Sequence, residues 1–124
     1  MKKILIAVCD MDGSYGEKLG EWISLRRGER MLSVSFSSPE RFLEYNSGTK
    51  QDIVLLGRGF YDHPQICKEV SGNAGATLWV YLHESEENMQ VPDDIRGLPR
   101  VEKYQPAQAI LREVFSLYQQ CETC

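Results

Sequence analysis

The chain has 124 residues and a net charge of −4, enough to bury one core but too short for a catalytic domain with a separate cap. The acidic balance argues against a partner bound through nucleic-acid phosphates, and no stretch approaches the roughly 20 apolar residues of a membrane-spanning helix. We therefore expect one domain over residues 1–120, without membrane insertion, followed by a tail or the start of a linker at residues 121–124.

Four cysteines indicate the compartment. Cys9 and Cys67 fall inside expected elements, and free thiols of this kind are typical of a cytoplasmic protein. Cys121 and Cys124 form a C-x-x-C pair, but nothing at a suitable spacing completes a four-ligand zinc site. The pair also follows a helix rather than starting one, where the dipole would lower a thiol pKa. We expect neither a metal nor a cofactor.

The first third of the chain alternates strand and helix patterns. Residues 4–8 are an apolar run typical of a strand. Ser14 and Glu17 fit a capping box for a helix over about residues 15–27. Residues 31–37 then alternate apolar residues with serines, which predicts a half-covered outer strand.

The middle of the chain repeats the alternation. Ser38, Pro39 and Glu40 form a helix start with a cap, a proline at the first helical position and an acid near the positive end of the dipole. Residues 52–56 are an apolar run behind one acid, typical of a central strand covered on both faces. Between glycine-rich loops, residues 65–70 predict a short helix.

The last third contains two further strands. Residues 77–82 repeat the central-strand pattern, and residues 84–99 support a helix of one or two turns at most. Residues 101–104 predict a short edge strand. Gln105 and Pro106 open a final helix with an apolar stripe formed by Ile110, Leu111, Val114, Leu117 and Tyr118. This order predicts an α/β, three-layer, flavodoxin-like fold: a five-stranded parallel sheet of order 2-1-3-4-5, with short or irregular third and fourth helices.

Such a topology brings several polar residues to one edge of the sheet, because ligands of doubly wound folds bind outside the carboxyl ends of the strands. The residues that follow the strands here are Asp10, Asp12, Gly57, His83 and Lys103. Acids follow the first strand, but glycine follows the third. We therefore interpret the edge as a site that keeps the arrangement of a ligand site but lacks the acid after the third strand that its chemistry would need.

The layout resembles the receiver (CheY-like) domains of two-component response regulators. In that family, acids after strand 1 hold Mg²⁺, an aspartate ending strand 3 accepts phosphate, a hydroxyl residue ends strand 4 and a lysine ends strand 5. Here Asp10 matches the first acid, but Met11 stands at the second, and a thioether is a poor ligand for Mg²⁺. Gly57 replaces the phosphoacceptor, His83 replaces the hydroxyl residue, and Lys103 matches the lysine that ends strand 5. The resemblance implies a pseudo-receiver without catalytic residues or metal.

Finer similarity concerns residues 38–43, 103–105 and 110–113. They look like the N-terminal atypical receiver domains of TadZ/CpaE-type pilus-assembly ATPases, which place a P-loop domain downstream and use the receiver for dimerisation and polar targeting. The resemblance implies a cytoplasmic protein-interaction or localisation module whose partners are a second copy of itself and an unidentified protein. We expect an interface at Tyr104, Gln105 and Ile110.

Other interpretations remain open from sequence alone. Asp10 and Asp12 could cap the following helix or keep a weak cation site, and Lys103 could simply neutralise them. Asp10 and Asp12 also resemble the first motif of haloacid dehalogenase-like Mg²⁺-dependent phosphatases, in which the first acid attacks phosphorus and the second moves the proton. Residues 13–16 resemble a flavodoxin phosphate loop, although two preceding carboxylates would repel a phosphate there.

Overall fold

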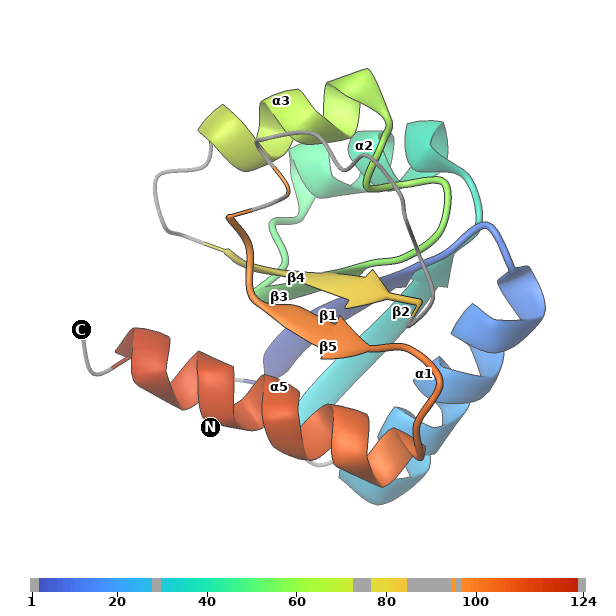
Figure 1. Ribbon diagram of the computed structural model, residues 1–124, viewed down its shortest axis with the longest axis vertical. Coiled ribbons are helices and arrows are strands. Elements are labelled where there is room, and N and C mark those ends of the chain that lie inside the picture. Colours follow the sequence, from blue (N-terminus) through green and yellow to red (C-terminus); the bar gives the residue numbers. More distant parts are fainter. Residues whose placement is uncertain (1–2, 28–29, 73–76, 85–94, 96, 123–124) are drawn as a thin grey trace.

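The computed structural model describes residues 3–27, 30–72, 77–84, 95 and 97–122 (Figure 1). Its centre is a parallel five-stranded sheet of order β2-β1-β3-β4-β5. The strands are β1 Ile4–Cys9, β2 Met31–Phe36, β3 Ile53–Leu56, β4 Leu78–His83 and β5 Arg100–Glu102. The helices are α1 Gly13–Arg27, α2 Pro39–Gly48, α3 Pro64–Gly72 and α5 Ala107–Glu122. The predicted fold class and strand order are confirmed.

Two apolar layers sandwich the sheet. Helices α1 and α5 cover one face and α2 and α3 the other (Figure 1). Alternate residues of β3 serve the two layers: Ile53 and Leu55 pack under α1 and α5, and Val54 and Leu56 pack under α2 and α3. All four are fully buried, as expected for a central strand whose two faces are both covered.

The outer position of β2 is also confirmed. Its burial decreases after Met31, and Leu32 is 53% exposed. Serines at alternate positions lie under α1, where Ser33 Oγ donates to the Gly20 carbonyl over 2.9 Å. Small residues on both elements therefore allow the helix to lie close to this edge strand.

Helix starts show one success and one correction. Ser38 caps α2 as predicted, with its hydroxyl oxygen accepting from the Arg41 amide, and Pro39 occupies the first helical position. The capping box at Ser14 is wrong, because α1 already begins at Gly13. Asp12 caps it instead: its carbonyl accepts from the Gly16 amide, and its carboxylate from the Tyr15 amide.

The last strand lies slightly earlier than predicted, at Arg100–Glu102 instead of residues 101–104, so Lys103 and Tyr104 follow it. The weak helix expected within residues 84–99 falls largely on residues outside the described ones; Ile95, which is described, is fully buried. Helix α5 continues to Glu122. No helix in the described ranges is long and apolar enough to cross a membrane.

Candidate functional site

A buried ion pair occupies the carboxyl edge of the sheet. Lys103 Nζ lies 2.7 Å from Asp10 Oδ2, and the two side chains are 2% and 0% exposed. Asp10 directly follows β1, and Lys103 directly follows β5, with β3 and β4 lying between these two strands in the sheet. The parallel order of the sheet therefore brings together two residues that are far apart in the sequence.

Backbone amides complete the surroundings of Asp10. Its Oδ1 accepts from the Asp12 amide at 2.8 Å, and its Oδ2 accepts from the Arg58 amide at 3.3 Å. A buried carboxylate is tolerated only when it is paired and hydrogen-bonded, and Asp10 meets both conditions. Its lone pairs are thus committed to groups of the protein itself.

Gly57 leaves no room for a side chain. It follows β3 directly, and its amide donates to the Cys9 carbonyl at 2.6 Å. A β-carbon at this position would collide with Asp10 Oδ2 and lie 2.8 Å from Asp10 Cγ and 2.9 Å from the Cys9 carbonyl oxygen. Asp10 thus takes up the space that a residue larger than glycine would need.

Met11 likewise fills the space beside a second glycine, Gly59. Gly59 has a φ of +84°, a backbone conformation that favours glycine. A β-carbon there would collide with Met11 Sδ and Cγ and lie 3.2 Å from Met11 Cβ. The thioether therefore covers the loop after β3, although 58% of Met11 remains exposed.

A magnesium ion does not fit these donors. Mg²⁺ requires oxygen ligands in near-octahedral arrangement, but the Asp10 carboxylate is held by Lys103 and two amides, and Met11 offers sulfur. The Asp12 carboxylate caps α1. In the described part of the chain, no group of three or more His, Cys, Asp or Glu side chains could hold a metal ion.

Two residues that sequence reasoning did not assign to the site complete the surroundings of Lys103. Glu84, which directly follows β4, has an oxygen 3.9 Å from Lys103 Nζ. Tyr15 of α1 presents its ring 4.7 Å from the same nitrogen and donates its hydroxyl to the Lys103 carbonyl at 3.2 Å. An acid after strand 4 was a readable signal for Glu84. Tyr15 carries no comparable signal, because the sequence pattern places it only at the start of the helix expected over about residues 15–27.

Burial, and then the charge of Asp10, shifts the pKa values of two neighbouring groups. Burial raises the pKa of the Cys9 thiol well above its ordinary value, and the adjacent Asp10 carboxylate raises it further. Burial, followed by the charge of Asp10, likewise raises the pKa of Tyr15. Both groups therefore stay protonated at neutral pH, which makes Cys9 a poor nucleophile.

His83 is brought to the same edge, but it contributes mainly backbone. Its carbonyl accepts from the Lys103 amide at 2.8 Å, and its ring packs beside Tyr81, with 6.1 Å between centroids. The structure therefore places Asp10, Met11, Asp12, Gly57 and Lys103 at one edge of the sheet, whereas His83 makes no side-chain hydrogen bond to them among the described residues.

The expected interface residues divide into surface and core. Tyr104 is 63% exposed, and its hydroxyl donates to Glu84 at 3.1 Å. Gln105 donates to the Glu102 carbonyl and to Glu113, both at 2.8 Å. The prediction is wrong for Ile110, which lies on the core-facing side of α5. It is 1% exposed, so it presents no surface to a partner.

The Asp10 carboxylate is poorly placed for nucleophilic catalysis. A nucleophilic aspartate must reach its substrate, but Asp10 is fully buried against Lys103. Residues 13–16, which resemble a phosphate loop, form the first turn of α1 instead. The geometry therefore gives no support to the phosphatase alternative or to a flavodoxin-like phosphate loop.

The strand order of the sheet and the order of helices around it are those of the receiver-domain fold. Comparison with solved structures gives the same result. A response regulator receiver protein from Burkholderia phymatum is 17% identical with a TM-score of 0.71, over 94% of this chain and 96% of that one. The N-terminal domain of a response regulator/sensory box/GGDEF three-domain protein from Carboxydothermus hydrogenoformans is 15% identical with a TM-score of 0.75, over 96% and 97%.

A two-component response regulator from Clostridium difficile is also similar, with 14% identity and a TM-score of 0.74 over 94% of this chain and 97% of that one. No protein-family model matches the chain, and no curated protein matches its sequence. The chain therefore has the receiver-domain fold, and identities this low establish the fold alone.

Proposed function

We propose that this chain is a pseudo-receiver: a receiver-fold module that accepts no phosphoryl group and works in the cytoplasm by binding other proteins. The observation that carries the proposal is the contact between Gly57 and Asp10. Glycine has no side chain to accept phosphate, and the Asp10 carboxylate fills the adjacent space. Lys103 already neutralises that carboxylate at 2.7 Å.

Treatment with small phosphodonors tests the first half of the proposal. We expect acetyl phosphate or beryllofluoride, each with Mg²⁺, to leave the intact mass, the amide NMR spectrum and the oligomeric state unchanged. A phosphorylatable receiver domain treated in parallel controls for the reagents. A Mg²⁺-dependent mass increase or spectral shift would contradict the proposal.

The contact surface is proposed to be the β5–α5 side of the molecule, used to form a homodimer. Tyr104 supports this assignment, because an exposed tyrosine held in one orientation is a typical interface anchor. Its hydroxyl is held by Glu84, and Lys103 Nζ lies 5.5 Å from its ring centroid. Gln105 is held on the same side by Glu102 and Glu113.

Sedimentation equilibrium tests this surface. We expect the wild-type chain to dimerise and Tyr104→Ala to weaken the dimer by roughly tenfold or more, as loss of an interface anchor does. Leu25→Ala is the matched control, since it removes an apolar side chain that is 84% exposed on α1. A wild-type monomer, or equal dimerisation of Tyr104→Ala, would exclude this interface.

The finer sequence resemblance supports a further proposal: the module belongs to a pilus-assembly ATPase of the TadZ/CpaE type and helps to localise it. A G-x-x-x-x-G-K-[ST] motif in the reading frame beyond Cys124 would support this assignment. A fluorescent fusion that is spread evenly through the cytoplasm, with no polar focus, would argue against it.

A further inference from the structure

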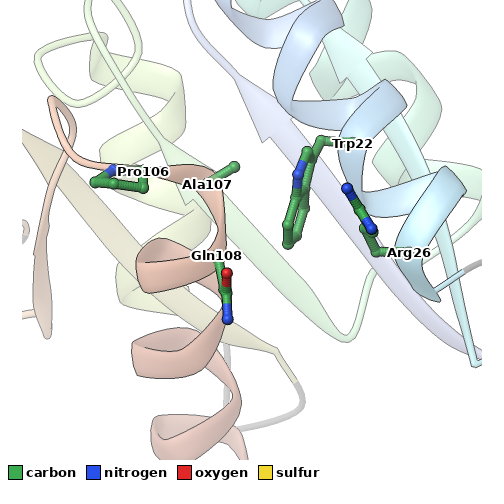
Figure 2. Close-up of a pocket in the computed structure, with 5 residues that line it drawn as sticks. All are labelled: Trp22, Arg26, Pro106, Ala107 and Gln108. Carbon is green, nitrogen blue, oxygen red and sulfur yellow. The ribbon is translucent and has the colours of Figure 1, made fainter.

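A groove runs between α1 and α5, on the face of the sheet away from α2 and α3. It consists of two adjoining hollows of about 450 Å³ each, which share Trp22 and Gln108 in their linings. Volumes of this size fall in the range of small-molecule sites. We call the hollow beside Arg26 and Ala107 the upper hollow and the one beside Arg30 and Arg112 the lower hollow. Figure 2 shows the upper hollow, with Trp22 and Arg26 on one side and the first turn of α5 on the other.

The lining has a distinctive chemistry for an acidic protein. Arg26 lines the upper hollow, and Arg30 and Arg112 line the lower one. None of the described residues that line either hollow is acidic. Within the part of the chain that the structure describes, none of these arginines forms an ion pair. Three guanidinium groups thus face one groove in a chain of net charge −4.

Helical spacing explains the alignment. Trp22 and Arg26 are four residues apart on α1, and Gln108 and Arg112 are four apart on α5, so each pair lies on one helix face. The Arg26 guanidinium carbon lies 5.7 Å from the Trp22 ring centroid and covers one side of the indole. Across the hollow from Trp22 lie Ala107 and Gln108 (Figure 2). The two helices therefore form a groove that is lined by the Trp22 indole in both hollows and by Arg30 and Arg112 in the lower one.

We propose that this groove binds a nucleotide. The base would stack on the indole of Trp22 in the upper hollow, and the phosphates would bind Arg30 and Arg112 in the lower one. Aromatic rings bind every base through its π-face, and arginine forks match phosphate oxygens. The size of the hollows and the net negative charge favour a small nucleotide over a nucleic-acid strand. This inference goes beyond the proposed protein contacts and does not depend on them.

Calorimetric titration with ATP, GTP and AMP, supported by Trp fluorescence, tests the proposal. We expect binding of at least one nucleotide, together with perturbation of the Trp22 indole. Adenosine and inorganic phosphate should each bind at least tenfold more weakly, because each has only half of the recognised chemistry. Arg112→Gln should lower the affinity by about tenfold, the equivalent of one charge-assisted hydrogen bond.

The controls separate this groove from general charge. Arg41→Gln removes the same charge from α2, on the other side of the sheet, and should leave binding unchanged. Because Trp22 also packs against the core, the surface variant Arg112→Gln carries the test if Trp22→Leu unfolds. No nucleotide binding at millimolar concentration would overturn the proposal. So would equal losses in Arg112→Gln and Arg41→Gln, equal binding of phosphate alone, or tighter, length-dependent binding of oligonucleotides.

Discussion

The Asp10 carboxylate fills the space that a side chain at Gly57 would need, so the residue after β1 leaves room only for glycine after β3. The two positions directly follow neighbouring strands, with Cys9 paired with Leu56 just before them. The contact therefore depends on the register of the sheet. The stability of variants at these positions reports directly on this geometry.

Enlarging Gly57 should destabilise the fold. Gly57→Ala places a β-carbon 2.8 Å from Asp10 Cγ and 2.9 Å from a backbone carbonyl, so we expect a loss of about 1–3 kcal/mol in the free energy of unfolding. Gly57→Asp should cost more, because it sets a second carboxylate against the first. Chemical denaturation measures both.

Gly48→Ala is the matched control, since a β-carbon there meets nothing within 4 Å. It should leave the free energy of unfolding unchanged or raise it by about 0.4–1 kcal/mol. A Gly57→Asp variant of wild-type stability that accepts phosphate from acetyl phosphate would show that Asp10 gives way readily.

Removing Lys103 should be severe. Lys103→Met leaves the Asp10 carboxylate buried without its counter-charge, a change that costs about 3–5 kcal/mol. The double variant Asp10→Ala/Lys103→Met should cost less than the sum of the single changes by about 0.5–3 kcal/mol. Urea unfolding of the four proteins gives the coupling energy.

Lys50→Met serves as the control for loss of a lysine ion pair. Lys50 Nζ lies 3.8 Å from Glu69 with both side chains largely exposed, so its loss should cost about 0–1 kcal/mol. Equal costs at positions 50 and 103 would mean that the Asp10–Lys103 pair is solvated in solution.

Asp12 is expected to act as a helix cap and not as a cation ligand. Asp12→Ala removes the acceptor for the Tyr15 amide and should cost about 1 kcal/mol, whereas Asp12→Asn keeps an oxygen there and should cost little. Thermal unfolding with and without Mg²⁺ checks both roles. A rise in Tm with Mg²⁺ that Asp12→Asn abolishes would instead support a residual cation site.

Alkaline titration should reveal the hydrogen bond between Tyr104 and Glu84. The Glu84 carboxylate accepts a hydrogen bond from the Tyr104 hydroxyl and thereby raises the pKa of Tyr104, and the nearby Lys103 charge partly opposes this shift. Because the folded-state pKa is the higher one, the bond's contribution to stability is fully present below the ordinary tyrosine pKa. It is lost as the pH rises through the raised value.

Glu84→Gln should therefore lower the pKa of Tyr104 toward its ordinary value, as followed by ultraviolet absorption of the tyrosinate. Glu113→Gln, which changes a carboxylate bonded to Gln105, should leave this titration in place. An unchanged Tyr104 titration in Glu84→Gln would show that the hydrogen bond does not form in solution.

Much of the fold could be predicted because the signals were redundant. The buried run before Gly57 and the alternating pattern after Met31 each indicated a strand and its place in the sheet. Once the strands were parallel, Asp10, Gly57 and Lys103 had to share one edge. The main features of the candidate site followed from topology, with no side-chain detail.

The rest required coordinates. Ser14 and Glu17 satisfied a capping pattern, but such a pattern cannot show that the helix starts two residues earlier, where Asp12 is the better-placed acceptor. Ile110 belonged to the apolar stripe of its helix and is buried accordingly, so its use as an interface residue conflicted with its own periodicity. Glu84 directly follows β4, so its place at this edge was readable, but the sequence does not show that its carboxylate lies beside Lys103.

Tyr15 has a further consequence. Its hydroxyl ties α1 to the carbonyl of Lys103, and its ring lies against the ammonium of the same residue. The segment that carries Tyr104 is thereby braced from the neighbouring helix as well as from Glu84. Under the proposed function, this braced segment would present one constant surface instead of alternating between two.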